Sequence, residues 1–93
     1  MITVVVRYTV KDGKANDFSG NVKKLAEATR QEKGCIFYEC SRSDADPLKF
    51  VMIEKWESKE DLDAHSASAH FKKYVPEIDL TLEEKALDTY SPL

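Results

Sequence analysis

Both histidines of the chain, His65 and His70, closely follow a strand-like segment that holds the carboxylate Glu54 and the only tryptophan, Trp56. Histidine has an ordinary pKa of about 6.5, so its imidazole is well suited to accept or give a proton near neutral pH. A carboxylate between apolar neighbours has a raised pKa when it is buried in a pocket, and it can then also act as a base. The candidate catalytic residues are therefore His65, then His70, with Glu54 in support.

Each of these residues also has a structural interpretation. Glu54 could form an ion pair across the sheet with Arg7, Arg42 or a lysine, because an ionised carboxylate in a core is costly unless it is paired. His65 could be a partly buried helix residue bonded to the backbone or to a carboxylate. His70 could serve at the beginning of a short helix.

The spacing of the two histidines does not favour a metal site. Five residues correspond to about 140° of rotation on an unbroken α-helix, whereas a zinc-binding pair on one helix is four residues apart. We therefore predict no metal ligands in this chain. If Ser68 interrupts the helix, however, the two imidazoles can converge on one pocket.

The residue pattern predicts the elements that must position these side chains. Strand-like alternation or composition occupies four segments: 2–10, 35–42, 49–57 and 84–90. Helical spacing runs from about Ala15 to Lys33 and is followed by Gly34, a common residue at helix ends. Ser58 and Ser68 are each expected to cap a helix.

The order of the elements is β-α-β-β-α-β, which is the ferredoxin-like α+β arrangement with a four-stranded antiparallel sheet. Helices can cover only one face of such a sheet, yet segments 2–10 and 49–57 are apolar on both faces. A second copy of the same sheet is the simplest cover for the other face. The pattern thus predicts a homodimer in which two sheets pack face to face.

Length and composition predict a single domain over residues 1–93. With 42% hydrophobic and 33% charged residues, the chain has the composition of a soluble globular protein. A net charge of −3 argues against a nucleic-acid partner. No apolar run approaches the roughly 20 residues of a membrane span, and no signal peptide is recognisable. We therefore expect no membrane partner and a cytoplasmic location.

The two cysteines agree with that location. Cys35 and Cys40 fall on one predicted strand, which would hold their Cα atoms roughly 16 Å apart. A disulfide needs less than about 7 Å between these atoms, so the cysteines cannot pair with each other, and free thiols fit a reducing compartment. Neither the motifs of nucleotide-binding loops nor that of serine hydrolases occurs in the sequence.

Several segments resemble the antibiotic biosynthesis monooxygenase (ABM) family, and most of all its quinol-monooxygenase branch. The matching segments are Glu32-Lys33-Gly34-Cys35 with Tyr38, Phe50 to Ser58, and Leu62, Ala64-His65, Ser68 and His70-Phe71. This likeness implies a dimeric α+β barrel. The chain differs from the haem-degrading branch at Val6, His65 and Val75.

The resemblance implies a cofactor-independent monooxygenase that acts on a quinol or polyhydroxylated aromatic small molecule with O₂. Trp56, Tyr38 and Phe71 would form the walls of the substrate pocket, and Arg7 or Glu54 would orient the anion or the base. No cofactor is expected.

Two alternatives remain open from the sequence. One is a non-enzymatic dimer that binds a small molecule. The other is an isomerase or degrading enzyme for a small signalling metabolite, which would use the cations Arg7, Arg42 and Lys55. The residues that face the pocket distinguish these functions. Convergent histidines beside an open apolar cavity favour the oxygenase, a filled cavity favours the binding or structural protein, and a basic cavity favours the isomerase.

Overall fold

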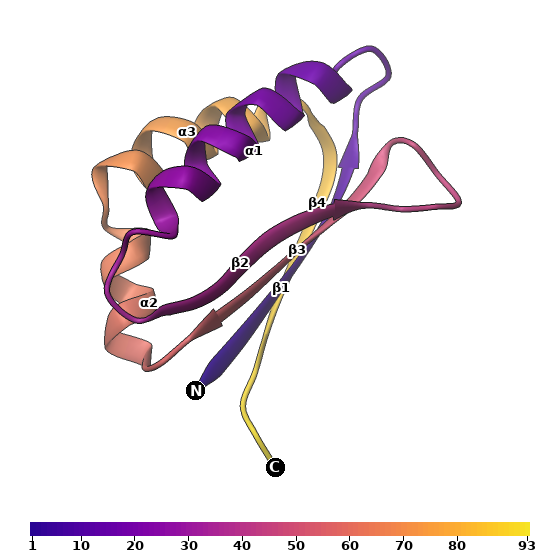
Figure 1. Cartoon of the computed structure of the whole chain (residues 1–93). Coiled ribbons are helices and arrows are strands. Elements are labelled where there is room, and N and C mark those ends of the chain that lie inside the picture. The colour runs from indigo at the N-terminus through magenta and orange to yellow at the C-terminus, as the bar shows by residue number, and fades with distance from the viewer.

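The computed structural model describes all residues from 1 to 93. Its elements, in chain order, are β1 (Ile2–Val10), α1 (Ala15–Thr29), β2 (Cys35–Arg42), β3 (Lys49–Trp56), α2 (Lys59–Ser66), α3 (Ala69–Asp79) and β4 (Leu82–Tyr90). The strands form one antiparallel sheet in the order β2-β3-β1-β4. The helices all lie on one side of this sheet (Figure 1). The predicted ferredoxin-like α+β fold is confirmed.

Alternation along β1 and β3 builds the core. Val4, Val6, Tyr8 and Val10 of β1 point to the helix side and are buried, as are Phe50, Met52, Glu54 and Trp56 of β3. The register places Val4 opposite Glu54 and Val6 opposite Met52. Apolar residues of α1 and Ile78 of α3 close this core from above. Burial of these side chains is the main favourable contribution to the fold.

The first helix ends earlier than the sequence predicted. We expected it to continue to Lys33, but α1 stops at Thr29 and residues 30–34 form turns. Backbone bonds from Gln31 N–H to the Ala28 carbonyl and from Glu32 N–H to the Thr29 carbonyl replace the helical pattern. Both bonds span three residues, which tightens the end of a helix. This turn carries Glu32 back toward α2 and α3.

The second helical region is interrupted where Ser68 was expected to interrupt it. Ser68 has an extended backbone, and its Oγ accepts a hydrogen bond from the backbone N–H of Phe71. Ser58 caps α2 in the same way, through the N–H of Asp61. The strand boundaries differ slightly from the prediction, because β3 ends at Trp56 and β4 begins at Leu82.

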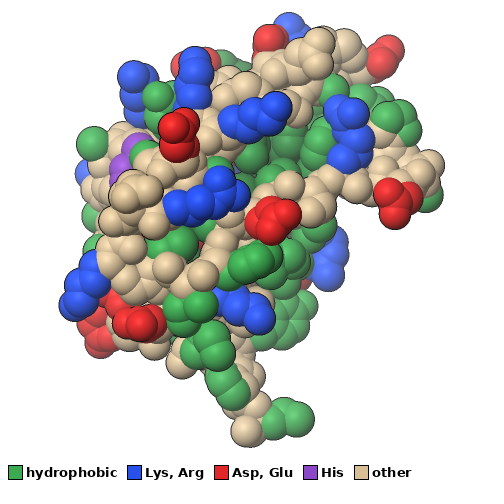
Figure 2. All heavy atoms as spheres, in the orientation of Figure 1, with side chains coloured by type: hydrophobic (Ala, Val, Ile, Leu, Met, Phe, Trp, Pro, Cys, Tyr) green, Lys and Arg blue, Asp and Glu red, His purple; other side chains and the backbone are tan.

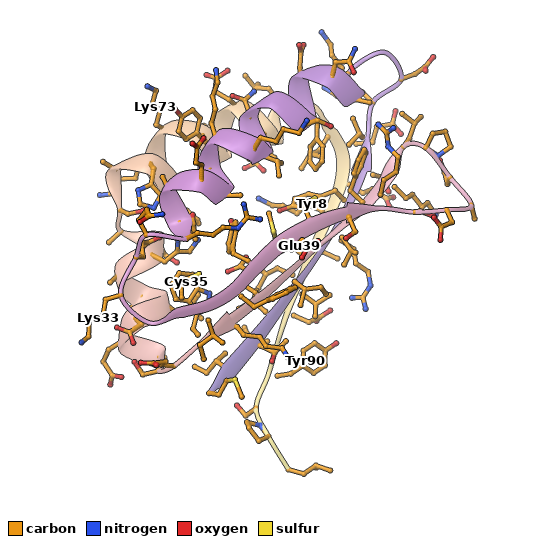
Figure 3. All side chains as sticks on the ribbon, in the orientation of Figure 1. Tyr8, Lys33, Cys35, Glu39, Lys73 and Tyr90 are labelled. Atoms are coloured by element: carbon orange, nitrogen blue, oxygen red, sulfur yellow. The ribbon has the colours of Figure 1, made fainter.

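The opposite face of the sheet carries no helix (Figure 1). Val5 of β1 and its partner Ile53 of β3 lie there half-buried, while Phe37 and Tyr90 are exposed. Figure 3 shows Tyr8 between the sheet and the helices and Tyr90 on the other side of the sheet. An exposed ion pair joins Arg7 to Asp88 at 3.3 Å on this open face. None of the helices is both long and apolar enough to cross a membrane.

Candidate functional site

His65 lies at the centre of an aromatic cluster near the end of α2. Only 1% of the surface of His65 is exposed to solvent. The imidazole is tilted against Trp56 with ring centroids 4.8 Å apart, and it meets Tyr38 and Phe71 edge-on at 5.5 and 5.2 Å. The side chains come from α2, β3, β2 and α3. The fold therefore brings His65 together with all three predicted wall residues.

A carboxylate that the sequence analysis did not select holds both histidines. Oε2 of Glu32 accepts a hydrogen bond from Nδ1 of His65 at 2.7 Å and another from Nε2 of His70 at 2.8 Å. In the space-filling view a histidine is visible among the helices (Figure 2). Glu32 belongs to one of the segments that resemble the family, but no spacing rule connects it with residues 33 and 38 positions away.

The position of His65 lowers the pKa of its imidazole below the ordinary value. The largest cause is burial, which disfavours the charged ring. The hydrogen bond and the negative charge of Glu32 oppose this effect, and the neighbouring His70 adds to it. The Nε2 atom of His65 makes no hydrogen bond within the chain. The imidazole of His65 is therefore neutral at physiological pH, and its Nε2 atom has an unshared lone pair.

Glu54 is also buried, with 6% of its surface exposed, and it lies on the helix side of β3. Its partner is neither an arginine nor a lysine, in contrast to the ion pair that we considered, because Nε1–H of Trp56 donates to its Oε1 at 2.9 Å. Burial raises the pKa of Glu54 to about 7, the Trp56 bond opposes the rise, and the charge of Glu32 adds to it. Glu54 does not orient the imidazole of His65; Glu32 does.

Further titratable side chains surround Glu54 on the same face of the sheet. Burial raises the pKa of the Cys40 thiol to about 11. Burial is also the main reason that the pKa values of Tyr8 and Tyr38 lie far above the usual range for phenols, and the charge of Glu54 contributes to both. These three groups are therefore uncharged near neutral pH.

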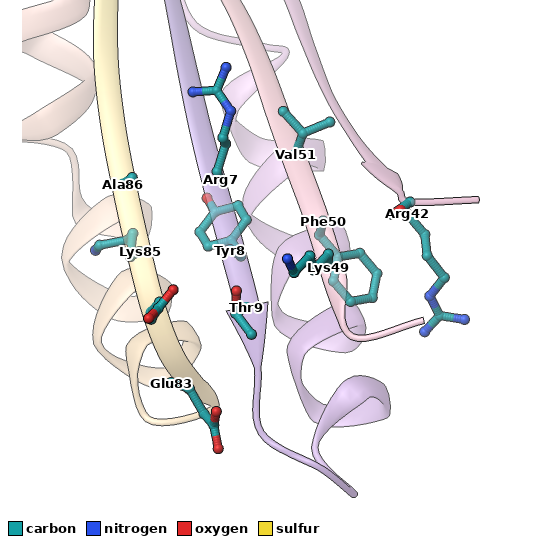
Figure 4. A pocket seen from close by; sticks show the side chains of 12 residues that line it. Arg7, Tyr8, Thr9, Arg42, Lys49, Phe50, Val51, Glu83, Lys85 and Ala86 are labelled. Atoms are coloured by element: carbon teal, nitrogen blue, oxygen red, sulfur yellow. The ribbon is translucent and has the colours of Figure 1, made fainter. Parts of the chain in front are cut away.

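Arg7 does not join this cluster. Its guanidinium lies on the open face of the sheet, bonded to Asp88, whereas the histidines lie on the helix side. Arg7 instead lines a hollow of about 790 Å³ at the ends of β1, β3 and β4. Figure 4 shows this hollow from the open face, with the helices behind the strands. Its charged residues are Arg7, Arg42, Lys49, Lys85, Glu83 and Glu84.

Two smaller hollows lie along α1 and β2. One, of about 240 Å³, reaches Cys40 beside Arg30. The other, of about 230 Å³, lies over Tyr38 and Phe37. None of these three hollows is lined by either histidine. Around His65, Trp56 is fully buried and Tyr38 nearly so, whereas His70 and Phe71 are half-buried.

Glu32, His65 and His70 are the residues best placed to hold a divalent metal ion, since their ligand atoms lie within 4.8 Å of one another. The two nitrogen–oxygen separations of 2.7 and 2.8 Å are those of charge-assisted N–H···O bonds. Two ligands at about 2.1 Å from one ion would stand farther apart, at about 3 Å or more. The cluster is therefore arranged as a hydrogen-bonded network.

Comparison with known proteins agrees with this architecture. Residues 1–77 match the family model described as antibiotic biosynthesis monooxygenase. A curated relative, YcnE of Bacillus subtilis, is 29% identical over 75 residues, which are 81% of this chain and 79% of YcnE; its own assignment as a monooxygenase is provisional.

Solved structures are similar over nearly the whole chain. A conserved protein from Methanosarcina mazei Go1 is 34% identical, with a TM-score of 0.93 over 96% of this chain and 89% of its own. A crystal structure described as antibiotic biosynthesis monooxygenase is 29% identical, with a TM-score of 0.94 over 100% of this chain and 99% of its own. On these matches, the chain belongs to the antibiotic biosynthesis monooxygenase family.

Proposed function

We propose that this protein is a cofactor-independent monooxygenase for a quinol or related polyhydroxylated aromatic molecule, with O₂ as the second substrate. The observation that carries the proposal is the buried imidazole of His65, which a carboxylate holds through Nδ1 while Nε2 is unbonded among aromatic rings. Membership of the monooxygenase family supports it. The fold alone would not, because one fold serves many reactions.

The first step is the removal of a phenolic proton. A phenol with a pKa of about 10 is a poor electron donor to O₂ until it loses its proton. Nε2 of His65 accepts that proton, and the charge of Glu32 stabilises the resulting imidazolium through the Nδ1–H bond. Trp56, Tyr38 and Phe71 supply the apolar walls that hold a flat ring and exclude water from the reactive anion.

The overall reaction balances without an external reductant. A hydroquinone and O₂ give a hydroxyquinone and one molecule of water, so the substrate itself supplies the electrons that reduce the second oxygen atom. The proton that His65 takes leaves with this water. The substrate enters beside Phe71, the one wall residue that is half-buried rather than enclosed.

Oxygen uptake with a panel of substituted hydroquinones tests the proposal. We expect uptake above the autoxidation rate, and a loss of about 10²- to 10⁴-fold in His65→Ala, the usual contribution of a general base. Lys73→Ala, an exposed change on α3, is the matched control and retains the wild-type rate. Absence of uptake with every hydroquinone, or uptake that His65→Ala leaves unchanged, would refute the proposal.

A second copy of the chain is the proposed partner. The half-buried apolar pair Val5 and Ile53 lies at the centre of the sheet face that no helix covers. Packing two such faces together would bury these side chains and close a dimeric α+β barrel.

We further infer that residues 1–93 act as one ABM-like domain, and that the free thiols of Cys35 and Cys40 suit a reducing cytoplasm.

One observation favours a second candidate function. The hollow on the open face is lined by four cationic residues and only two acidic ones, which suits an anionic metabolite and thus an isomerase or a small-molecule-binding protein. Calorimetric titration with inorganic phosphate and with benzoate tests this function. Binding that Arg42→Gln weakens, together with absent oxygen uptake, would favour it over the monooxygenase.

A further inference from the structure

A single oxygen atom joins the two histidines. Oε2 of Glu32 lies 2.7 Å from Nδ1 of His65 and 2.8 Å from Nε2 of His70. The three residues come from the turn after α1, the last turn of α2 and the first turn of α3. His65 is buried, while the side chains of Glu32 and His70 are 16% and 21% exposed. The buried ring is thus connected to the surface through this carboxylate.

Because Oε2 of Glu32 is the acceptor, it determines which ring nitrogen of each histidine carries a hydrogen. An ionised carboxylate oxygen only accepts hydrogen bonds, so both ring nitrogens that contact it must carry a hydrogen. His65 is then protonated at Nδ1 and has its lone pair at Nε2. His70 is protonated at Nε2 and has its lone pair at Nδ1. The same oxygen therefore requires the two neutral imidazoles to be opposite tautomers.

We propose that Glu32 is the positioning residue of the base, and that His70 opposes it by sharing the same carboxylate oxygen. The tautomer assignment stands on the contacts alone, whereas the role in catalysis rests on the proposed function. Glu32 keeps the lone pair of His65 at Nε2 and steadies the imidazolium that forms there. His70 bonds to the same oxygen of Glu32, and positive charge on His70 disfavours the imidazolium form of His65.

Among the charged and titratable groups around His65, Glu32 and His70 have opposite effects on its pKa. Glu32 faces it from the turn, His70 from α3 and Tyr38 from β2; Glu54 lies behind Trp56 on β3, and Cys35 lies near Glu32. Glu32 favours the charged form of His65, and positive charge on His70 disfavours it. Removing one neighbour should therefore shift the titration of His65 in the direction opposite to removing the other.

Nitrogen-15 NMR of the histidine rings tests the assignment without any substrate. We expect opposite tautomers in the wild-type protein above pH 8, with a pyrrole-type nitrogen at Nδ1 of His65 and at Nε2 of His70. Glu32→Gln keeps an acceptor oxygen but removes the negative charge that raises the pKa of His65, so this pKa should fall. His70→Gln should raise it. Glu60→Gln, which removes an exposed charge elsewhere on α2, should change neither.

The pH dependence of hydroquinone oxidation then tests the role. Activity requires neutral His65, so its rise with pH should move to lower pH in Glu32→Gln and to higher pH in His70→Gln, and the plateau rate should fall in Glu32→Gln because the base is weaker. The proposal would be overturned if both histidines had the same tautomer in the wild-type protein. It would also be overturned if the pKa of His65 shifted in the same direction in Glu32→Gln and His70→Gln. Opposite tautomers in a protein without oxygen uptake would leave the assignment standing and refute the monooxygenase function, so the two failures are distinguishable.

Discussion

Trp56 donates a hydrogen bond from Nε1–H to Oε1 of Glu54, the residue two positions earlier on the same strand, at 2.9 Å. Both side chains point to the helix side of the sheet and are buried, Trp56 completely. The ring of Trp56 also lies against the imidazole of His65. One tryptophan therefore connects the buried carboxyl group with the candidate base.

The free energy of unfolding of Glu54→Gln, compared with that of wild type at the same pH, should increase as pH rises. Burial places the folded pKa at about 7, above its ordinary value of 4.5, so the unfolded chain releases this proton at lower pH than the folded one. Wild-type stability thus falls between these two pH values, by about 3 kcal/mol at roughly 1.4 kcal/mol per unit. Urea unfolding at pH 4.5, 6 and 8 measures the difference.

The exposed neighbour Glu57 provides the control for that experiment. Glu57→Gln should leave the pH dependence of unfolding unchanged. If Glu54→Gln shows the same pH dependence as wild type, Glu54 titrates normally in the folded protein and its assignment as a protonated buried acid is wrong.

Trp56→Phe should destabilise the fold and should do so more at pH 8 than at pH 5. Phenylalanine has no N–H donor, so Glu54 loses its partner, and a buried polar group without a partner costs about 1 to 3 kcal/mol. The loss is greater for the ionised carboxylate, which needs the donor more. Circular dichroism follows the unfolding, because this variant has no tryptophan to report it. Equal destabilisation at both pH values would show that packing rather than the hydrogen bond matters.

Gly34→Ala should lower stability by about 1 to 3 kcal/mol, because Gly34 has a positive φ of 83° and such a backbone strains any other residue. A Cβ there would also collide with the side chain of Asp61. Gly34 lies two residues after Glu32, and its carbonyl accepts the backbone N–H of Glu57. The substitution should therefore also disturb the histidine cluster, which NMR of the histidine rings would reveal.

Gly20→Ala is the matched control for that substitution. Gly20 lies within α1 with open space around it. Alanine should stabilise the helix by up to about 1 kcal/mol. Thermal unfolding should thus move in opposite directions for the two glycines, and equal shifts would contradict the strain assigned to Gly34.

Ile53→Lys should convert the proposed dimer to a monomer. A lysine at the centre of the open sheet face would place a charge between two apolar surfaces, where burial without a partner is costly. Light scattering should give about twice the chain mass of 10.6 kDa for wild type and a single chain mass for the variant. Asn16→Lys, which adds the same charge on exposed α1, should remain a dimer. A monomeric wild type would disprove the face-to-face packing.

Much of the fold could be predicted because it depends on local patterns. The alternation of Val4, Val6 and Tyr8, or of Met52, Glu54 and Trp56, identifies strands and the face that each residue occupies. Ser58 and Ser68 identify the beginnings of two helices. The end of α1 was less predictable, because the backbone N–H groups of residues 31 and 32 bond three residues back instead of four, a change that the residue pattern does not mark.

The candidate site could be predicted only in part. His65 with Trp56, Tyr38 and Phe71 was selected from residue types and family resemblance, and the fold brings these four together. Arg7 was selected too, but the alternation of β1 puts it on the opposite face from the histidines. Glu32 was missed as a site residue, because a glutamate in a charged turn looks like solvated surface.

The sequence by itself determined the strands, the helix beginnings and the residue types that could transfer a proton, since these follow from spacing and side-chain chemistry within a few residues. Only the tertiary structure decided that Glu32 would meet His65 and His70, because 33 and 38 residues separate them and three different elements must pack to close that distance. It also decided that Glu54 bonds to Trp56 on its own strand instead of a cation across the sheet, because the fold buries Glu54 on the helix side while Arg7 pairs with Asp88 on the open face. Contacts between distant elements depend on packing, which no local pattern records.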